Sequence, residues 1–114
     1  MEIKDSKFYR DKCYINGEWV NAVSGETISV NNPANLKEIG TVPKCGTSET
    51  RNAIEAANNA WPEWRAKSAR QRSEILRKWF DLMIENKEEL AQIMTVEQGK
   101  PINEIGRASC RERV

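Results

Sequence analysis

The sequence predicts an α/β fold in which a few short strands are followed by amphipathic helices. The pair Asn16-Gly17 lies between two short β-prone runs, which is the pattern of a tight hairpin. After Gly46, the spacing of apolar residues changes from the period of a strand to that of a helix. The chain has 114 residues, which is enough for one small domain and not for two.

Four short strands are expected before Gly46. Asn and Gly accept the positive φ angles of a type I′ turn, so the first two strands should form a hairpin around Asn16-Gly17. The third strand alternates with period two, and the fourth ends at a proline. The expected strands are Cys13–Ile15, Glu18–Val20, Thr27–Val30 and Glu38–Val42.

The first helix is expected to start at Thr47 or Ser48, because either side chain can cap a helix. Glu49 would then lie in the first turn, where the helix dipole favours a negative charge. Pro62 removes a backbone donor, so this helix is expected to stop or kink near Ala60.

Two further helices are expected. Ser68 and Gln71 have the spacing of a capping box that opens the second helix, and Asn86 is a possible cap for the third. Gly99 stands where a helix-ending glycine is expected, and Pro101 can begin another helix. The apolar faces are expected to comprise Ala53, Ala57, Ala60, Trp61 and Trp64 in the first helix, Ile75, Leu76, Trp79, Phe80 and Met83 in the second, and Leu90, Ile93 and Met94 in the third.

The tryptophans admit two interpretations. They could form a stacking platform for sugars or nucleic-acid bases, or they could be packing residues. The helical spacing of Trp61, Trp64 and Trp79 favours packing.

The composition excludes several classes of protein. Hydrophobic residues make up 39% of the chain, which is too many for a disordered tail. The formal net charge of +1 provides no attractive field for nucleic acid or an anionic membrane. No apolar run is long enough to span a bilayer, and the segment Met1–Asp5 lacks the apolar stretch of a secretory signal. We therefore expect a cytoplasmic protein with neither nucleic acid nor a membrane as a partner.

The residues needed for common catalytic sites are missing. The sequence contains no histidine, so Ser-His-Asp and Cys-His sites cannot be built from this chain alone, and the commonest zinc ligand is absent. The three cysteines are widely spaced and predict no disulfide framework. Cys13 is expected to be a small buried residue, and Cys45, beside Lys44, shows at most a sign of modest reactivity.

The glycines give no nucleotide-binding pattern. They form no G-x-G-x-x-G, and Gly99–Pro101 lacks the flanking residues of a phosphate loop. Glu97 could be a general base, but solvation at a helix end is the favoured interpretation. The chain is therefore expected to contain no catalytic, cofactor-binding or metal-binding residue.

Several motifs follow one another between Cys13 and Glu104. They are Ile15–Val20 (INGEWV), Asn32–Asn35 (NPAN), Ile39–Pro43 (IGTVP), Trp64–Arg65, Arg72–Leu76 and Glu97–Pro101 (EQGKP). In order and spacing these motifs resemble the aldehyde dehydrogenase family. The segments Glu49–Arg51, Trp79–Met83 and Met94–Pro101 are most similar to the bacterial succinate-semialdehyde dehydrogenases within that family.

The resemblance implies the N-terminal part of an NAD(P)-binding domain, which is incomplete here. In this family a cysteine thiolate attacks the aldehyde, a hydride passes to NAD(P)⁺, and a glutamate-activated water hydrolyses the thioester. The nucleophile, the glutamate, the oxyanion donor and the cofactor-binding residues follow the motif at Gly99–Pro101, so none is carried over to a position here. The cofactor of the longer parent would be NAD or NADP, and its aldehyde would be succinate semialdehyde.

Two interpretations of the function stay open. The chain is either a fragment that is inactive alone, or a non-catalytic module that packs on or regulates a full-length subunit through its apolar helix faces. A fragment would have the remainder of the dehydrogenase and neighbouring subunits of a homo-oligomer as partners. A third reading, an unrelated α+β binding protein with chance motifs, is disfavoured. Without the implied core, the isolated chain is expected to be unstable or loosely folded.

Three segments are distinguished along the chain. Residues 1–12 read as an arm laid over another part of the protein or as a loose terminus. Residues 13–104 carry the resemblance. Residues 105–114 resemble the translation of a common sequencing adapter and are expected to be non-native, and the alternative is a genuine basic C-terminal tail.

One position departs from the family pattern. Leu36 stands where the family often has glycine in a tight turn. If the turn needs a positive φ, leucine would cost about 1–2 kcal/mol there.

Overall fold

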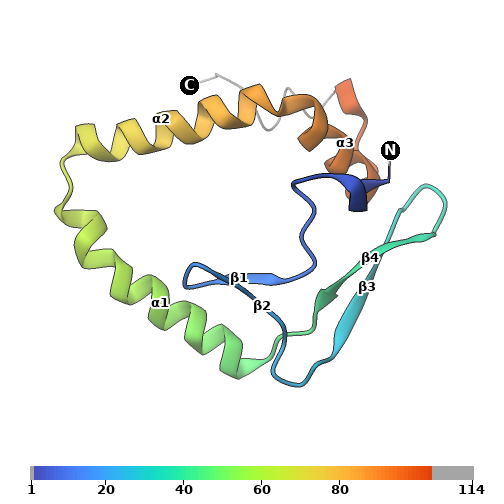
Figure 1. Cartoon of the computed structure of the whole chain (residues 1–114), viewed down its shortest axis with the longest axis horizontal. Coiled ribbons are helices and arrows are strands. Elements are labelled where there is room, and N and C mark those ends of the chain that lie inside the picture. Colours follow the sequence, from blue (N-terminus) through green and yellow to red (C-terminus); the bar gives the residue numbers. More distant parts are fainter. Residues whose placement is uncertain (1, 104–114) are drawn as a thin grey trace. The chain divides into compact units, whose positions relative to one another are not determined.

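The computed structural model describes residues 2–103, so the segment expected to be non-native, 105–114, lies outside the described residues. The described chain divides into two compact units. One comprises residues 2–9, 29–40 and 77–103, and the other comprises Arg10–Ile28 and Thr41–Leu76. In chain order the elements are a short 3₁₀ helix η1 (Ile3–Asp5), strands β1 (Cys13–Ile15), β2 (Glu18–Val20), β3 (Thr27–Asn31) and β4 (Glu38–Pro43), and helices α1 (Thr47–Ala66), α2 (Ala69–Glu85) and α3 (Lys87–Gln98) (Figure 1).

The expected hairpin is confirmed in β1 and β2. The strands are antiparallel, and Tyr14 pairs with Trp19 across them. Asn16 has a φ of 53° and Gly17 a φ of 80°, which are the two positive values that a type I′ turn requires. The paired rings of Tyr14 and Trp19 lie 5.0 Å apart between centroids, so the hairpin also gains an aromatic cross-strand contact.

Strands β3 and β4 pair with each other and are each one residue longer than expected. The connecting loop closes through a hydrogen bond from the Asn32 N–H to the Lys37 carbonyl, at 2.9 Å. Leu36 has a φ of 59°, so the turn does place a leucine in the left-handed region. The cost anticipated for this residue therefore applies, and its side chain is 77% exposed and gains little packing in return.

The N-cap residue of α1 lies one position before the first of the two expected caps. Gly46 is the N-cap residue, and neither Thr47 nor Ser48 caps the helix as predicted. The reason is that Glu49, three residues into the helix, accepts a hydrogen bond from the Gly46 N–H at 2.8 Å. Glycine contributes no side chain to this arrangement, so the returning carboxylate supplies the cap.

Of the two outcomes expected at Pro62, the stop of α1 near Ala60 does not occur, and a kink there stays a prediction. The helix continues through Pro62 to Ala66. A proline deletes one backbone donor and obstructs one carbonyl, but the amides that follow it keep acceptors in the preceding turn. The chain turns instead at Lys67, where the backbone is extended and a new helix start follows directly.

That helix start is the capping box predicted for α2. The Gln71 N–H donates to Ser68 Oγ at 3.2 Å, and the Ser68 N–H donates to Gln71 Oε1 at 2.9 Å. Exposed ion pairs at helical spacing follow, Arg70 with Glu74 at 3.1 Å and Arg77 with Asp81 at 3.5 Å. Pairs of this kind contribute little each, but they mark the solvent face of the helix.

The ends of α3 follow the sequence signals only in part. Asn86 occupies the N-cap position, but its side-chain amide donates to the Leu82 carbonyl at 2.8 Å and makes no cap for α3. Asn86 therefore serves the end of α2 instead. Gly99 ends α3 with a φ of 75°, as predicted, and Ile102 is helical directly after Pro101.

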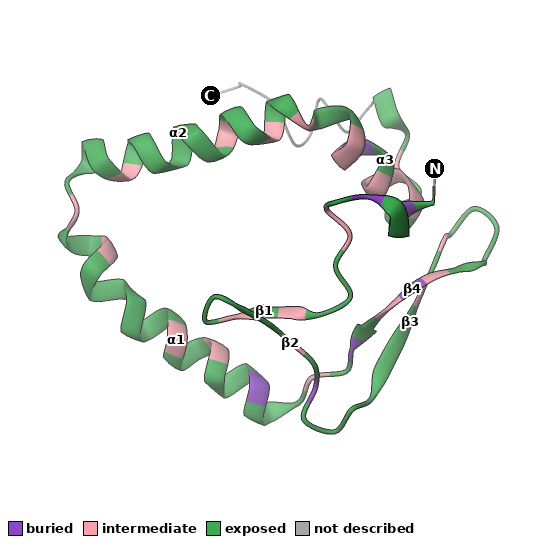
Figure 2. Cartoon of the chain, in the orientation of Figure 1, coloured by how far each residue is buried: buried purple, intermediate pink, exposed green. Residues whose placement is uncertain are grey.

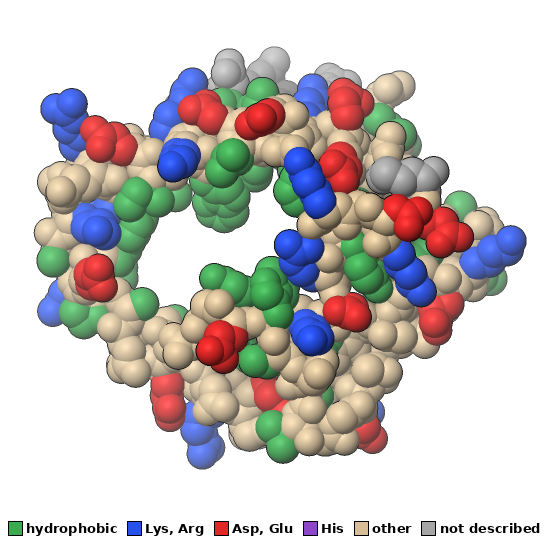
Figure 3. Space-filling model, in the orientation of Figure 1, with side chains coloured by type: hydrophobic (Ala, Val, Ile, Leu, Met, Phe, Trp, Pro, Cys, Tyr) green, Lys and Arg blue, Asp and Glu red, His purple; other side chains and the backbone are tan. Residues whose placement is uncertain are grey.

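Few side chains are well buried in the described residues. The buried hydrophobic residues are Ile3, Ala22 and Ala91, and no side chain is less than 2% exposed (Figure 2). Ile3 lies in η1, which contacts α3, and nearby Ser6 donates a hydrogen bond to Glu89 of α3. Large apolar side chains remain on the surface instead, and Figure 3 shows a group of them over α2.

The expected packing of the tryptophans is found only in part within this chain. Trp64 is half-buried, whereas Trp61 is 51% and Trp79 is 62% exposed. The apolar faces of α1 and α2 were predicted from spacing alone, and spacing does not say whether a partner surface belongs to the same chain.

Candidate functional site

Glu49 and its hydrogen-bond donors form the first cluster of chemical interest, at the start of α1. Glu49 is only 6% exposed, and its two carboxylate oxygens have separate donors. The Val23 N–H donates to Oε1 at 2.6 Å, while the Gly46 N–H and the Ser48 hydroxyl donate to Oε2 at 2.8 and 3.1 Å. One carboxylate thus joins the segment after β2 to the beginning of α1.

These donors stabilise the charged form of the carboxylate. Hydrogen bonds from the backbone, that of Val23 first, lower the pKa of Glu49 to about 2 from an ordinary value of 4.5. A carboxylate with so low a pKa and with its oxygens already occupied is a poor general base. These contacts fit a structural role, in which the carboxylate ties the segment after β2 to the start of α1.

Cys13 and Cys45 form the second cluster of chemical interest. They are 32 residues apart in the sequence, yet their Sγ atoms lie 3.5 Å apart. Both are half-buried, so Cys13 is less enclosed than expected. The hydrogen bond with Cys13, burial and the charge of Glu49 raise the pKa of the Cys45 thiol, whereas an activated nucleophile needs a lowered pKa. This direction agrees with the favoured interpretation of Cys45 as an unreactive residue and gives no support to activation by Lys44.

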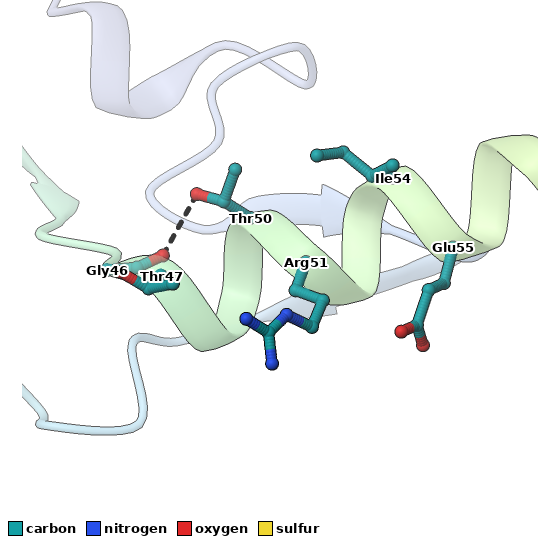
Figure 4. A pocket seen from close by; sticks show the side chains of 6 residues that line it. All are labelled: Gly46, Thr47, Thr50, Arg51, Ile54 and Glu55. Atoms are coloured by element: carbon teal, nitrogen blue, oxygen red, sulfur yellow. Dashed lines mark hydrogen bonds between the residues drawn. The ribbon is translucent and has the colours of Figure 1, made fainter.

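A shallow surface runs along the first turns of α1 (Figure 4). All of its lining residues come from α1 itself or from Gly46, so one element supplies the whole surface. The Thr50 hydroxyl is directed back to the Gly46 carbonyl, with which it forms a 2.9 Å hydrogen bond, and Arg51 and Glu55 lie away from Thr50. No cysteine, serine or histidine lies among these lining residues.

Neither a metal centre nor a membrane segment is found in the part of the chain that the structure describes. Residues 2–103 contain no group of three histidine, cysteine, aspartate or glutamate side chains that could hold a metal ion. No helix within the same range is long and apolar enough to cross a membrane. Glu97, weighed above as a general base, is exposed near the end of α3.

The sequence did not predict either cluster, because each depends on a contact between segments that are distant along the chain. The spacing of Cys13 and Cys45 carries no signal, because strands and turns of the intervening chain bring them together. The capping role of Glu49 had a local signal, a glycine followed three residues later by glutamate, but its bond to Val23 joins segments 26 residues apart.

Comparison with known proteins places these elements in a longer chain. A glutarate-semialdehyde dehydrogenase of Pseudomonas putida is 59% identical over 104 residues, which are 91% of this chain and 22% of the relative. The NADP⁺-dependent succinate-semialdehyde dehydrogenase GabD of Escherichia coli K12 is 54% identical over the same coverage. The chain thus spans about a fifth of the length of the curated relatives it matches.

Solved structures agree with the sequence comparison. The succinate-semialdehyde dehydrogenase from Burkholderia pseudomallei matches with a TM-score of 0.84 and 52% identity, over 89% of this chain and 21% of that protein. The family model for aldehyde dehydrogenases matches residues 19–112, a range that includes most of the segment expected to be non-native. The origin of residues 105–114 therefore stays a prediction. The match covers most of the chain, and it shows that the chain belongs to the aldehyde dehydrogenase family.

Proposed function

We propose that residues 13–104 are the N-terminal part of an NAD(P)⁺-dependent dehydrogenase that oxidises a semialdehyde, such as succinate semialdehyde, to the dicarboxylate. The observation that carries the proposal is the 54–59% identity to succinate- and glutarate-semialdehyde dehydrogenases along 91% of the chain. Both named substrates pair an aldehyde with a carboxylate, so that pair of groups defines the substrate class. The cytoplasm is the proposed compartment of the parent enzyme.

The chain by itself is proposed to be inactive. The family chemistry needs an activated thiolate, and the two described cysteines are half-buried and face each other. The described residues also do not fit an NAD(P) site. A helix N-terminus binds a pyrophosphate through free backbone N–H groups, but at α1 the Gly46 N–H is already bound by Glu49. Catalytic and cofactor-binding groups are therefore assigned to other parts of the parent, including neighbouring subunits if it is a homo-oligomer.

A second candidate function has support from the exposed apolar face of α2. Ile75, Leu76, Trp79 and Leu82 are 47–62% exposed, which is unusual for large apolar side chains on one helix. Such a face suits a non-catalytic module that packs on a full-length dehydrogenase subunit. The same face also suits a fragment whose own core lies elsewhere in its chain.

A chimera tests the first proposal. Residues 1–103 replace the corresponding N-terminal part of the E. coli enzyme, and the formation of reduced nicotinamide is followed by absorbance with succinate semialdehyde and NADP⁺. We expect the chimera to retain activity within about tenfold of the parent, because half of the replaced residues are identical and the remote body supplies the reacting groups. The 114-residue chain alone is expected to give no turnover.

Two controls make the result specific. The E. coli enzyme without its N-terminal part measures how much activity remains when that part is missing. Full-length E. coli enzyme mixed with this chain tests the module interpretation, since stable co-elution and altered activity would support it. A soluble, folded chimera without activity, or turnover by the chain alone, would refute the first proposal.

A further inference from the structure

The two thiols of Cys13 and Cys45 are held together by backbone on both sides. Cys13 begins β1 and is fixed by its antiparallel pairing with Val20. On the other side, Lys44 donates its N–H to the Glu26 carbonyl at 2.9 Å, and Gly46 donates to Glu49 at 2.8 Å. Cys45 lies between these two anchored residues, so the 3.5 Å separation of the Sγ atoms follows from the local fold.

We propose that Cys13 and Cys45 are the site of a reversible intramolecular disulfide, formed by exchange with a small-molecule disulfide such as oxidised glutathione. The Cys13 thiolate attacks one sulfur of glutathione disulfide, which forms a mixed disulfide and releases one glutathione thiolate. Cys45 then loses its proton and attacks the Cys13 sulfur, which closes the protein disulfide and releases the second glutathione. The protein is oxidised by two electrons, and one glutathione disulfide is reduced to two thiols.

The geometry favours the second step. A disulfide has an S–S distance of about 2.05 Å, so the sulfurs need to approach by roughly 1.5 Å, which is within the reach of side-chain rotation. Both residues are half-buried, so a small oxidant can reach them. The raised pKa of Cys45 lowers its thiolate fraction in the reduced state, so the first attack is assigned to Cys13.

The bond would link Cys13, the first residue of β1, to Cys45, which lies directly before the N-cap residue of α1. It would close the loop between two positions 32 residues apart and restrict the unfolded chain. Oxidation is therefore expected to stabilise the unit that contains the β1–β2 hairpin and α1. Nothing in this inference depends on the substrate or on the enzymatic role of the parent.

The test uses the whole 114-residue chain. The reduced protein is incubated with oxidised and reduced glutathione and trapped by alkylation, and the disulfides are identified by peptide mass mapping. Parallel samples contain trimethylamine oxide, which favours folded states, or guanidinium, which removes them. In guanidinium, loop statistics favour Cys13–Cys45 by only about threefold over Cys45–Cys110 and about fivefold over Cys13–Cys110. Under folding conditions we expect Cys13–Cys45 to account for nearly all of the disulfide.

Single variants provide the matched controls. The variant Cys110→Ser is expected to form the same disulfide, because Cys110 is not one of the two proposed partners. In Cys13→Ser and Cys45→Ser, the exchange is expected to stop at a persistent glutathione adduct on the remaining cysteine of the proposed pair. The proposal is overturned if pairing in trimethylamine oxide matches that in guanidinium, or if Cys110→Ser accumulates separate adducts on Cys13 and Cys45 without closing the bond.

Discussion

At the scale of single residues, Glu49 makes a pH dependence that can be measured. Its pKa in the folded chain is about 2, below the ordinary 4.5, because backbone N–H groups hold the carboxylate. The stabilisation is therefore fully present above about pH 4.5 and is lost as the pH falls toward 2. We expect the helical circular dichroism signal of the chain to decrease over this window.

The variant Glu49→Gln isolates that effect. Glutamine keeps the shape and one acceptor oxygen, but it carries no charge that protonation could remove. We expect it to be less stable than the natural chain at neutral pH and equal to it near pH 2. If the two proteins differ by the same amount at all pH values, the loss of stability in acid does not come from Glu49.

Leu36 is a second residue whose effect on stability follows from its backbone φ angle. Its φ of 59° costs about 1–2 kcal/mol for a residue with a Cβ, and its exposed side chain contributes little packing. In the chimera with the E. coli body, we expect Leu36→Gly to stabilise the protein by about 0.5–1 kcal/mol, because part of the relief is offset by the greater freedom of glycine in the unfolded state. Chemical denaturation of the chimera measures the difference. Leu36→Ala keeps the strained angle, so an equal gain from alanine would contradict the explanation.

At the scale of elements, sequence signals succeeded where the partner of a residue lies within one turn. Ser68 with Gln71 and Asn16 with Gly17 were predicted correctly for this reason. Pro62 misled because a missing donor is a local cost, whereas the length of α1 depends on all of its other backbone bonds. Asn86 misled because its side chain can either accept a hydrogen bond from the first amides of α3 or donate one to a carbonyl at the end of α2, and it donates to Leu82.

The apolar face of α2 gives a prediction that separates this chain from its parent. Trp79 is 62% exposed here, so Trp79→Ala is expected to leave the helical circular dichroism signal of the isolated chain unchanged. In the chimera with the E. coli body, the same substitution is expected to cost about 3–5 kcal/mol, because the ring would lie against the rest of the enzyme. Circular dichroism of the chain and chemical denaturation of the chimera measure the contrast. Glu74→Ala on the exposed ion-pair face is the control and is expected to have a small effect in both.

At the scale of the whole molecule, the sequence predicted the order of elements and the family, but not the contacts between distant segments. Val23 with Glu49 and Cys13 with Cys45 depend on how the hairpin lies against α1, and no periodicity encodes that placement. The expected absence of catalytic residues rested on the missing histidines and nucleotide-binding patterns together with the motif order of the family. That expectation stays a prediction until turnover by the chain alone has been measured.

The small core leads to the last prediction, that the isolated chain lacks a cooperative fold. A stable domain offsets its conformational entropy by burying large apolar side chains, and the buried hydrophobic residues described here are one isoleucine and two alanines. A two-state domain of about 100 residues absorbs about 60–80 kcal/mol on melting. By scanning calorimetry we expect residues 1–104 to give a broad transition with much less heat, and the chimera to give a sharp one. A sharp transition of full enthalpy from residues 1–104 alone would show that the exposed faces of α1 and α2 need no further chain, and it would favour an independent module over a piece of a larger core.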